Sequence, residues 1–254
     1  MTPEVLATTF DTNWVAISFI VSVIGAYTAL WVAPSVSSGH GKVNWFNAGL
    51  SGLALGGVGI WSMHFLGMLA YEVPLAVGYR MTELVVSLVA AVVVSSLAIG
   101  YMAARPFTFA RLAVAGPLAG LGVAVMHYLG MYGMRFGGYF DWDWNVVGLS
   151  IAIAVVAASA ALWLAFHAKR RSHRTVAALV MGMAVCTMHY TGMAAASVVC
   201  TTANRRAFLP DLLRPSDLGM AIVVVAIGVA AMVAMDVFLQ RMHAGQAARG
   251  AVRA

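Results

Sequence analysis

Seven long apolar runs constrain what this 254-residue chain can fold into more than any other feature of its sequence. A helix needs roughly 20 mostly apolar residues to cross the hydrocarbon core of a bilayer, and each run reaches that length. None alternates apolar with polar residues as a membrane β-barrel requires. We therefore expect an all-α integral membrane protein. Its seven transmembrane helices are predicted over residues 14–33, 46–70, 82–104, 112–134, 145–167, 175–199 and 218–239.

The composition agrees with a membrane protein, because 62% of the residues are hydrophobic and only 9% are charged. A soluble domain carries about 25% charged residues, so this chain has too little polar surface to cover a water-facing globule. Its net charge of +6 is scattered over the connecting segments, with no basic face interleaved with aromatic residues. We therefore expect no nucleic-acid partner. The densest basic segment, KRRSHR at 169–174, is typical of a topology signal or of a contact with anionic lipid heads.

The basic residues also predict how the chain lies in the membrane. If the N-terminus is outside, ten of the 15 Lys and Arg fall on the cytoplasmic side and five on the outer side. This distribution follows the positive-inside rule, so we expect an extracytoplasmic N-terminus and a cytoplasmic C-terminus. The first residues, MTPEVLATTFD, lack the basic segment of a secretory signal, so the first run should remain as a membrane anchor.

One six-residue motif occurs three times, as MHFLGM at 63–68, MHYLGM at 126–131 and MHYTGM at 188–193. Its histidines, His64, His127 and His189, recur at intervals of 63 and 62 residues. Each interval contains two apolar runs, so the three motif helices should be parallel and related by an axis along the membrane normal. We expect three two-helix repeats, made of helices 2–3, 4–5 and 6–7, with the N-terminal helix as an extra.

The spacing within each motif predicts a shared site. The His and the second Met are four residues apart, so they lie on one helix face, and the Gly between them lets a neighbour approach closely. All three motifs fall near the outer ends of their helices, so the three imidazoles should reach one depth. Histidine inside a membrane helix is costly and usually lines a functional site.

These residue types suit a soft metal ion. Imidazole binds copper, zinc, iron and nickel, whereas thioether favours Cu(I), and neutral ligands need no buried carboxylate. We therefore expect copper as the cofactor, with packing as the alternative role of the methionines, especially the first Met of each motif. The candidate metal ligands are His64, His127, His189, Met68, Met131, Met193, Met63, Met126 and Met188.

An aromatic residue follows each histidine. It is Tyr128 and Tyr190 in two copies but Phe65, which cannot coordinate, in the first. We therefore expect Tyr128 and Tyr190 to contact a bound cofactor by stacking or hydrogen bonding. Cys186, one turn before His189, is a further candidate ligand or a packing residue. A disulfide with Cys200 is not expected, because one continuous helix through both cysteines would hold them about 20 Å apart.

The three motifs resemble those of the MHYT domain, a bacterial integral-membrane sensory domain named for the four residues that stand here at 188–191. The resemblance extends from about Trp14 to about Gln240 and implies a multi-pass protein of the bacterial cytoplasmic membrane. It also implies a sensor of O₂, CO or NO that binds the gas through copper held by motif His and Met residues. On this basis residues 1–240 form one seven-helix membrane domain, and 241–254 form a short basic cytoplasmic tail.

The same resemblance implies a signalling output. Members of that family often carry a cytoplasmic cyclic-di-GMP cyclase or phosphodiesterase, or a histidine kinase. The tail at 241–254 is too short to fold alone, so we expect signalling to a separate cytoplasmic partner and no enzyme activity in this chain. A haem protein with axial histidines, a copper-dependent membrane redox enzyme and a copper carrier are the alternatives. No catalytic residues are predicted, because the spans lack a nucleophile–base pair or paired carboxylates.

Overall fold

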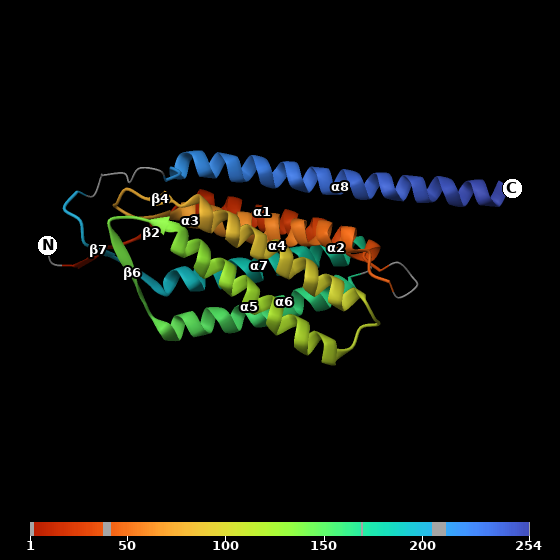
Figure 1. The fold of residues 1–254 in the computed structure, drawn as a ribbon, viewed down its shortest axis with the longest axis horizontal. Helices are drawn as coiled ribbons and strands as arrows, with labels where there is room; N and C mark the ends of the chain where they lie inside the picture. Colours follow the sequence, from red (N-terminus) through yellow and green to blue (C-terminus); the bar gives the residue numbers. More distant parts are fainter. Residues whose placement is uncertain (1–2, 38–41, 169, 205–211, 254) are drawn as a thin grey trace.

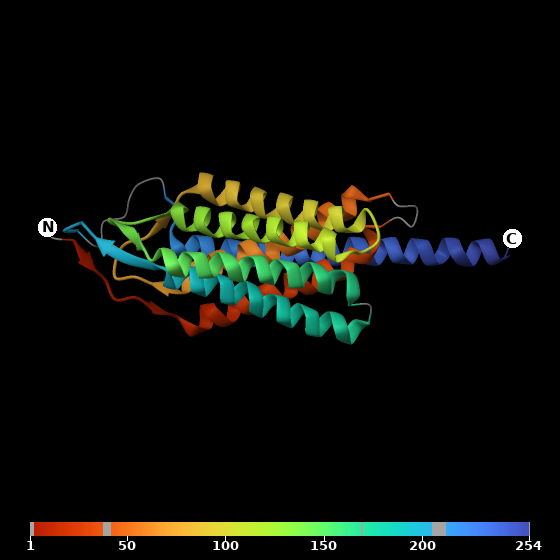
Figure 2. The same ribbon diagram turned by 90° about the horizontal axis from the view of Figure 1, so that it is seen from below.

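The computed structural model describes residues 3–37, 42–168, 170–204 and 212–253, and it confirms the predicted fold class. Seven helical segments of the described residues are long and apolar enough to cross a membrane. They form one elongated bundle with roughly aligned axes (Figure 1 and Figure 2). The segments are α1 (Thr12–Val32), α2–η2–α3 (Trp45–Gly52, Leu53–Ser62 and Met63–Ala70), α4 (Met81–Ala103), α5 (Phe109–Gly133), α6 (Trp144–His167), α7 (Arg171–Ala194) and α8 (Pro215–Arg253).

Six of these segments alternate around a ring. We call the three that carry a motif, α2–η2–α3, α5 and α7, the motif helices, and we call α1, α4 and α6 the outer helices. α4 packs against α2–η2 and α5, α6 packs against α5 and α7, and α1 packs against α7 and the first motif helix. The ring therefore has the threefold arrangement that the sequence repeat predicts, with each motif helix held between two outer helices.

Short strands close each repeat at the end of the bundle that lies opposite the C-terminus of α8 (Figure 1). In every repeat a strand before the outer helix pairs with the strand that directly follows the motif helix, and the pairing is antiparallel. The pairs are β2 (Thr9–Phe10) with β3 (Tyr71–Glu72), β4 (Gly78–Tyr79) with β5 (Met134–Arg135), and β6 (Gly138–Trp142) with β7 (Ala196–Cys200), and β1 (Glu4–Val5) adds to the free edge of β7.

The structural repeat is therefore an outer helix followed by a motif helix, and α8 is the helix outside the ring, packed against α1, η2 and α3. We expected the N-terminal helix to be the extra one. The start of α1 explains the difference, since DTNWVAIS at 11–18 matches DWNVVGLS at 143–150, where α6 begins. In both segments the Asp caps the helix by accepting a hydrogen bond from the backbone N–H of the Asn two residues later.

One predicted helix boundary is wrong. We expected a helix over 175–199, but α7 ends at Ala194 and residues 196–200 form β7. The segment ASVVC contains two valines, which favour a strand, and β7 has a partner on each side. Cys200 therefore lies on a strand and Cys186 on α7, so the two do not share a helix. Both are buried free thiols, and no disulfide joins them.

The first motif helix contains a π-helix, η2, that the sequence pattern did not predict. It packs very closely against α1 where two glycines meet: a Cβ atom on Gly25 of α1 would lie 2.2 Å from the backbone N of Gly59 in η2. Ser22 Oγ of α1 donates a hydrogen bond of 2.8 Å to the Gly59 carbonyl. π-Helical turns are uncommon and occur often at functional sites, and this one ends two residues before His64.

The last helix is longer than predicted. We expected a span over 218–239 and a tail from residue 241, but α8 begins at Pro215 and continues to Arg253. Both views show it running past the ends of the other helices, away from the strands (Figure 1 and Figure 2). Residues 241–253 therefore prolong a helix that packs along α1 and the first motif helix.

Candidate metal centre

Three histidines, one from each motif helix, meet at the centre of the ring. His64, His127 and His189 are 0%, 1% and 1% exposed. Their Nδ1 atoms form a triangle with sides of 3.1 Å (His64–His127), 3.1 Å (His64–His189) and 3.3 Å (His127–His189). The rings stand nearly perpendicular to one another, at 77°, 84° and 88°. The imidazoles thus converge at one depth, as the parallel repeats predict.

The other ring nitrogen of each histidine lies against a glycine of the next motif helix. An added Cβ atom would lie 2.2 Å from His64 Nε2 at Gly130, 2.3 Å from His127 Nε2 at Gly192, and 2.2 Å from His189 Nε2 at Gly67. The three contacts form a closed cycle around the ring. The sequence predicted that these glycines admit a close neighbour, and the structure shows that the neighbour is an imidazole ring.

Hydrogen bonding satisfies this triangle in only one arrangement of protons. In a neutral imidazole one ring nitrogen carries the proton and the other offers a lone pair. If one Nδ1 is protonated it can donate to the others, but two protonated Nδ1 atoms at 3.1–3.3 Å would oppose each other. If all three protons lie on Nε2, three lone pairs converge on one point. The three Nε2 atoms are also buried and have no hydrogen-bond partner among the described residues.

A metal ion fits this donor set. Three nitrogen ligands at about 2.0 Å from one ion and at tetrahedral angles are about 3.3 Å apart, close to the sides of the Nδ1 triangle. A cation there would accept all three lone pairs and leave the protons on Nε2. Within the described residues this is also the group of His, Cys, Asp and Glu side chains whose ligand atoms lie close enough to hold an ion.

All six motif methionines are buried, but their surroundings differ. Met68, Met131 and Met193, the second methionines, pack in the main core together with Met126. Met188 packs instead with two alanines, Ala124 and Ala154. Met63 is buried as well, at 1% exposure. All six methionines thus pack within the protein, and which of them would bind a metal stays a prediction.

The two motif tyrosines are anchored by serines of the outer helices. The Tyr190 and Ser18 hydroxyls are 3.0 Å apart, and Tyr128 makes the same contact with Ser150. Each tyrosine ring also lies beside the imidazole that precedes it, at a centroid distance of 4.8 Å. The predicted hydrogen-bonding and stacking roles therefore have partners in the protein itself, and a contact of either tyrosine with a cofactor stays a prediction.

The first repeat uses the equivalent serine differently. Ser87 of α4 corresponds to Ser18 and Ser150, but Phe65 has no hydroxyl group to meet it. Trp61 takes this place, and its Nε1–H donates to Ser87 Oγ at 3.0 Å. These three serines are buried and escaped the sequence prediction, although each lies seven residues after the residue that caps the outer helix. That recurrence was the available signal.

A buried tyrosine from β4 also supports the first motif. Tyr79 is 2% exposed and packs edge-on against Phe65, with their ring centroids 6.2 Å apart. Its hydroxyl donates a hydrogen bond of 3.4 Å to the Met68 carbonyl oxygen. Burial raises the pKa of the Tyr79 hydroxyl, so it remains protonated and able to donate. The sequence gives no sign of this contact, because it depends on how β4 turns back over α3.

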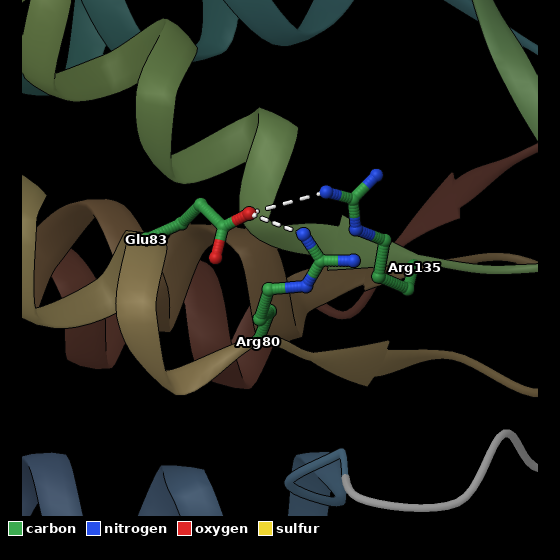
Figure 3. Close-up of polar contacts among 3 residues, drawn as sticks. All are labelled: Arg80, Glu83 and Arg135. Atoms are coloured by element: carbon green, nitrogen blue, oxygen red, sulfur yellow. Dashed lines mark hydrogen bonds and ion pairs between the residues drawn. The ribbon is translucent and has the colours of Figure 1, made fainter.

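An ion cluster fixes the end of the second motif helix (Figure 3). Glu83 of α4 is buried, and its Oε1 accepts from Arg80 at 3.0 Å and from Arg135, directly after α5, at 3.1 Å. The Arg135 guanidinium also lies over the Tyr132 ring, 4.5 Å from its centroid. Arg135 follows His127 closely in the sequence. The cluster therefore fixes the position of His127 along the bundle axis relative to α4.

The family comparison identifies the repeat. Two segments, 57–115 and 120–178, match the family model MHYT, described as a bacterial signalling protein N-terminal repeat. Each match contains one complete copy of the His motif and the outer helix that follows it. The chain belongs to the MHYT family. With its seven spans, this MHYT chain is a multi-pass protein of the bacterial inner membrane and carries a signalling-type membrane domain.

Named relatives agree with the family. The MHYT chain is 41% identical over 198 residues to the bifunctional diguanylate cyclase/cyclic di-GMP phosphodiesterase MucR of Pseudomonas aeruginosa, covering 75% of this chain and 28% of that protein. It is 37% identical to the cyclic di-GMP phosphodiesterase NbdA of the same organism and 28% identical to the signaling protein YkoW of Bacillus subtilis, covering 74% of this chain and 24% of each. It thus spans about a quarter of their length. No solved structure matches the chain.

Proposed function

We propose that this MHYT domain is a membrane sensor whose histidine triad binds a metal ion, with copper as the metal. The triangle of Nδ1 atoms carries the proposal, because three buried imidazole nitrogens at 3.1–3.3 Å can direct three lone pairs at one cation. Neutral imidazoles, with the thioethers of the same motifs, are soft ligands that favour Cu(I) over harder ions. A monovalent ion also brings the least charge into an apolar bundle whose described residues place no carboxylate among the ligand atoms of the site.

Copper, when bound, supplies a centre that can take up O₂, CO or NO. The protein's part is to hold the three rings. The glycine cycle fixes the position of each imidazole relative to the next helix, and the strand pairs hold the three motif helices at one height. The serine contacts of Tyr128 and Tyr190 brace two of the motif helices against their outer helices.

A signal would pass from the triad through the first motif helix to α8. His64 lies on α3, and both α3 and η2 pack against α8, which then runs to the far end of the molecule. Two of the relatives are named as enzymes of cyclic di-GMP turnover, so we propose a cytoplasmic output of that kind. Such signalling requires two arrangements of the helices with different affinity for the sensed ligand.

Metal analysis of the purified protein tests this proposal. We expect close to one copper ion per chain in protein purified in detergent, measured by elemental analysis. His64→Ala, His127→Ala and His189→Ala should each lower copper affinity at least tenfold, because a two-nitrogen site remains. His173→Ala, which changes an exposed histidine far from the triad, should leave copper content unchanged.

Two results would contradict the proposal. Folded wild-type protein that takes up no copper when supplied with it would remove the sensor mechanism, and equal copper in the triad variants would place the metal elsewhere. An optical spectrum of the same sample distinguishes copper from haem as the bound group, since a Soret band would indicate haem. Circular dichroism and elution as a single species would show that the variants are folded.

A further inference from the structure

An apolar cavity lies directly behind the histidine triad. Its volume is about 50 Å³, and its lining includes Ile60, Val123 and Val185. Each of these residues precedes a triad histidine by four positions, so it lies on the same face one turn earlier. Helical side chains lean toward the N-terminus of their helix, so the imidazoles lean toward Ile60, Val123 and Val185. The cavity thus begins one turn from the Nδ1 triangle, on the side away from the strands.

The cavity wall is almost entirely hydrocarbon. Ser95 is the one lining residue with a polar side chain, and none of the lining residues is exposed. A water molecule needs two to four polar partners, so water gains little in such a space. Apolar cavities of this kind stay dry and take up xenon or small apolar molecules. The space suits an uncharged molecule of a few atoms that requires no hydrogen bonds.

Two local features keep this space open. The π-helix η2 contributes Leu55 and Ile60, and Leu55 precedes its histidine by nine residues, whereas Ala119 and Met181 precede theirs by eight. The wider π-helical turn accommodates the additional residue while keeping Leu55 on the cavity face. On the opposite side, α6 lines the cavity mainly with alanines, at 154, 157, 158 and 161.

Only a thin wall separates the cavity from the lipid-facing surface. A larger groove of about 580 Å³ lies between α4 and α5, and its lining residues Leu97 and Leu118 are 54% and 63% exposed. Ala98 and Ala119 line both this groove and the cavity. The side chains of these two alanines therefore lie between the groove and the cavity.

We propose that the cavity binds one small uncharged apolar molecule, of the size of a diatomic gas, which enters from the bilayer between Ala98 and Ala119. Apolar gases partition into lipid, so a lateral entrance takes the molecule from the phase in which it is concentrated. The role of the cavity as a waiting site beside a metal rests on the proposed function. The binding of the small molecule does not rest on the proposed function, because the cavity wall contains no triad histidine.

Xenon is the probe for the binding site. Crystals of the metal-free wild-type protein under xenon pressure should show one xenon atom between Ile60, Val123 and Val185, and xenon NMR should show one saturable site. Ala154→Phe and Ala158→Leu each fill the cavity and should abolish the site. Ala160→Phe, an exposed position on the same helix that does not line the cavity, should preserve it.

The wild-type result decides the binding proposal even if a filled variant does not fold. Absence of xenon from the wild-type cavity would overturn it, and so would full xenon occupancy in both filled variants. Protein that binds xenon but takes up no copper would contradict the sensor mechanism and leave the proposed cavity site intact. The reverse pair of results, copper bound and no xenon, would remove the cavity site alone.

The entrance is tested by the rate of xenon exchange. Ala98→Val and Ala119→Val should each slow xenon exchange at least tenfold by NMR. Both residues also line the cavity, so the exchange rate of each variant is measured at its own equilibrium occupancy. Leu118→Phe is the matched control, since it enlarges a side chain in the same groove that does not line the cavity. Unchanged exchange in the two alanine variants would overturn the proposed route.

Discussion

The motif glycines and histidines act on one another between repeats. Gly67 makes room for His189, Gly130 for His64 and Gly192 for His127, so each motif supplies both a ring and the space for another ring. A change of one glycine therefore disturbs a histidine that is more than 60 residues away in sequence. This mutual dependence explains how three separate helices present three Nδ1 atoms at nearly equal distances.

Replacing any motif glycine by alanine should weaken metal binding. In Gly67→Ala, Gly130→Ala or Gly192→Ala the new Cβ would lie within 2.3 Å of an Nε2 atom, so the imidazole must move away from the triangle. We expect copper affinity, measured by competition with a chelator, to fall at least tenfold, or about 1.4 kcal/mol. Gly148→Ala is the control, because nothing lies within 4 Å of its added Cβ. Equal copper affinities for all four variants would show that the motif glycines do not position the imidazoles.

Among the elements, the strands and the ion cluster determine how far each motif helix extends along the bundle axis. Antiparallel pairing ties the end of each motif helix to the start of the outer helix in its own repeat. The second repeat adds Glu83, which holds Arg80 before α4 and Arg135 after α5. Since three histidines must meet at one depth, an error of one residue in any of these pairings would take a ring out of the site.

Removing the shared carboxylate should loosen the second repeat. Glu83→Ala leaves two arginines without their partner, and we expect a loss of about 2 kcal/mol in stability, because both arginines are partly exposed. A lowered midpoint of thermal unfolding in detergent would show this effect. Glu72→Ala, at an exposed strand position, should change the midpoint much less. A midpoint for Glu83→Ala as high as that of wild type would show that the cluster does not support the fold.

For the whole molecule, the bundle has two unlike ends. The strands lie at one end, and α8 extends past the other (Figure 2). The triad is close to the strands, because each motif helix ends within two turns of its histidine. The distribution of Lys and Arg predicts that the strand end is extracytoplasmic. A signal sensed at the triad would then cross most of the membrane along α8.

This orientation is directly measurable. Green fluorescent protein joined to the C-terminus should fluoresce, because the C-terminus is expected in the cytoplasm. Pro3→Cys, at an exposed position, should react with a membrane-impermeant maleimide in intact spheroplasts, and the buried Cys186 and Cys200 give a low background. Labelling only after the cells are broken would show that the positive-inside prediction is wrong for this chain.

The sequence by itself determined the class of fold and the convergence of the site. Long apolar runs must form helices in lipid, because a helix satisfies its own backbone hydrogen bonds, and a motif repeated over two spans must return to the same depth. What the sequence could not reveal depends on contacts between distant segments. The pairing of β7, the π-helix before His64, the serine partners and the position of α8 outside the ring follow from packing between repeats. The orientation of each imidazole follows in the same way from the glycine of another helix.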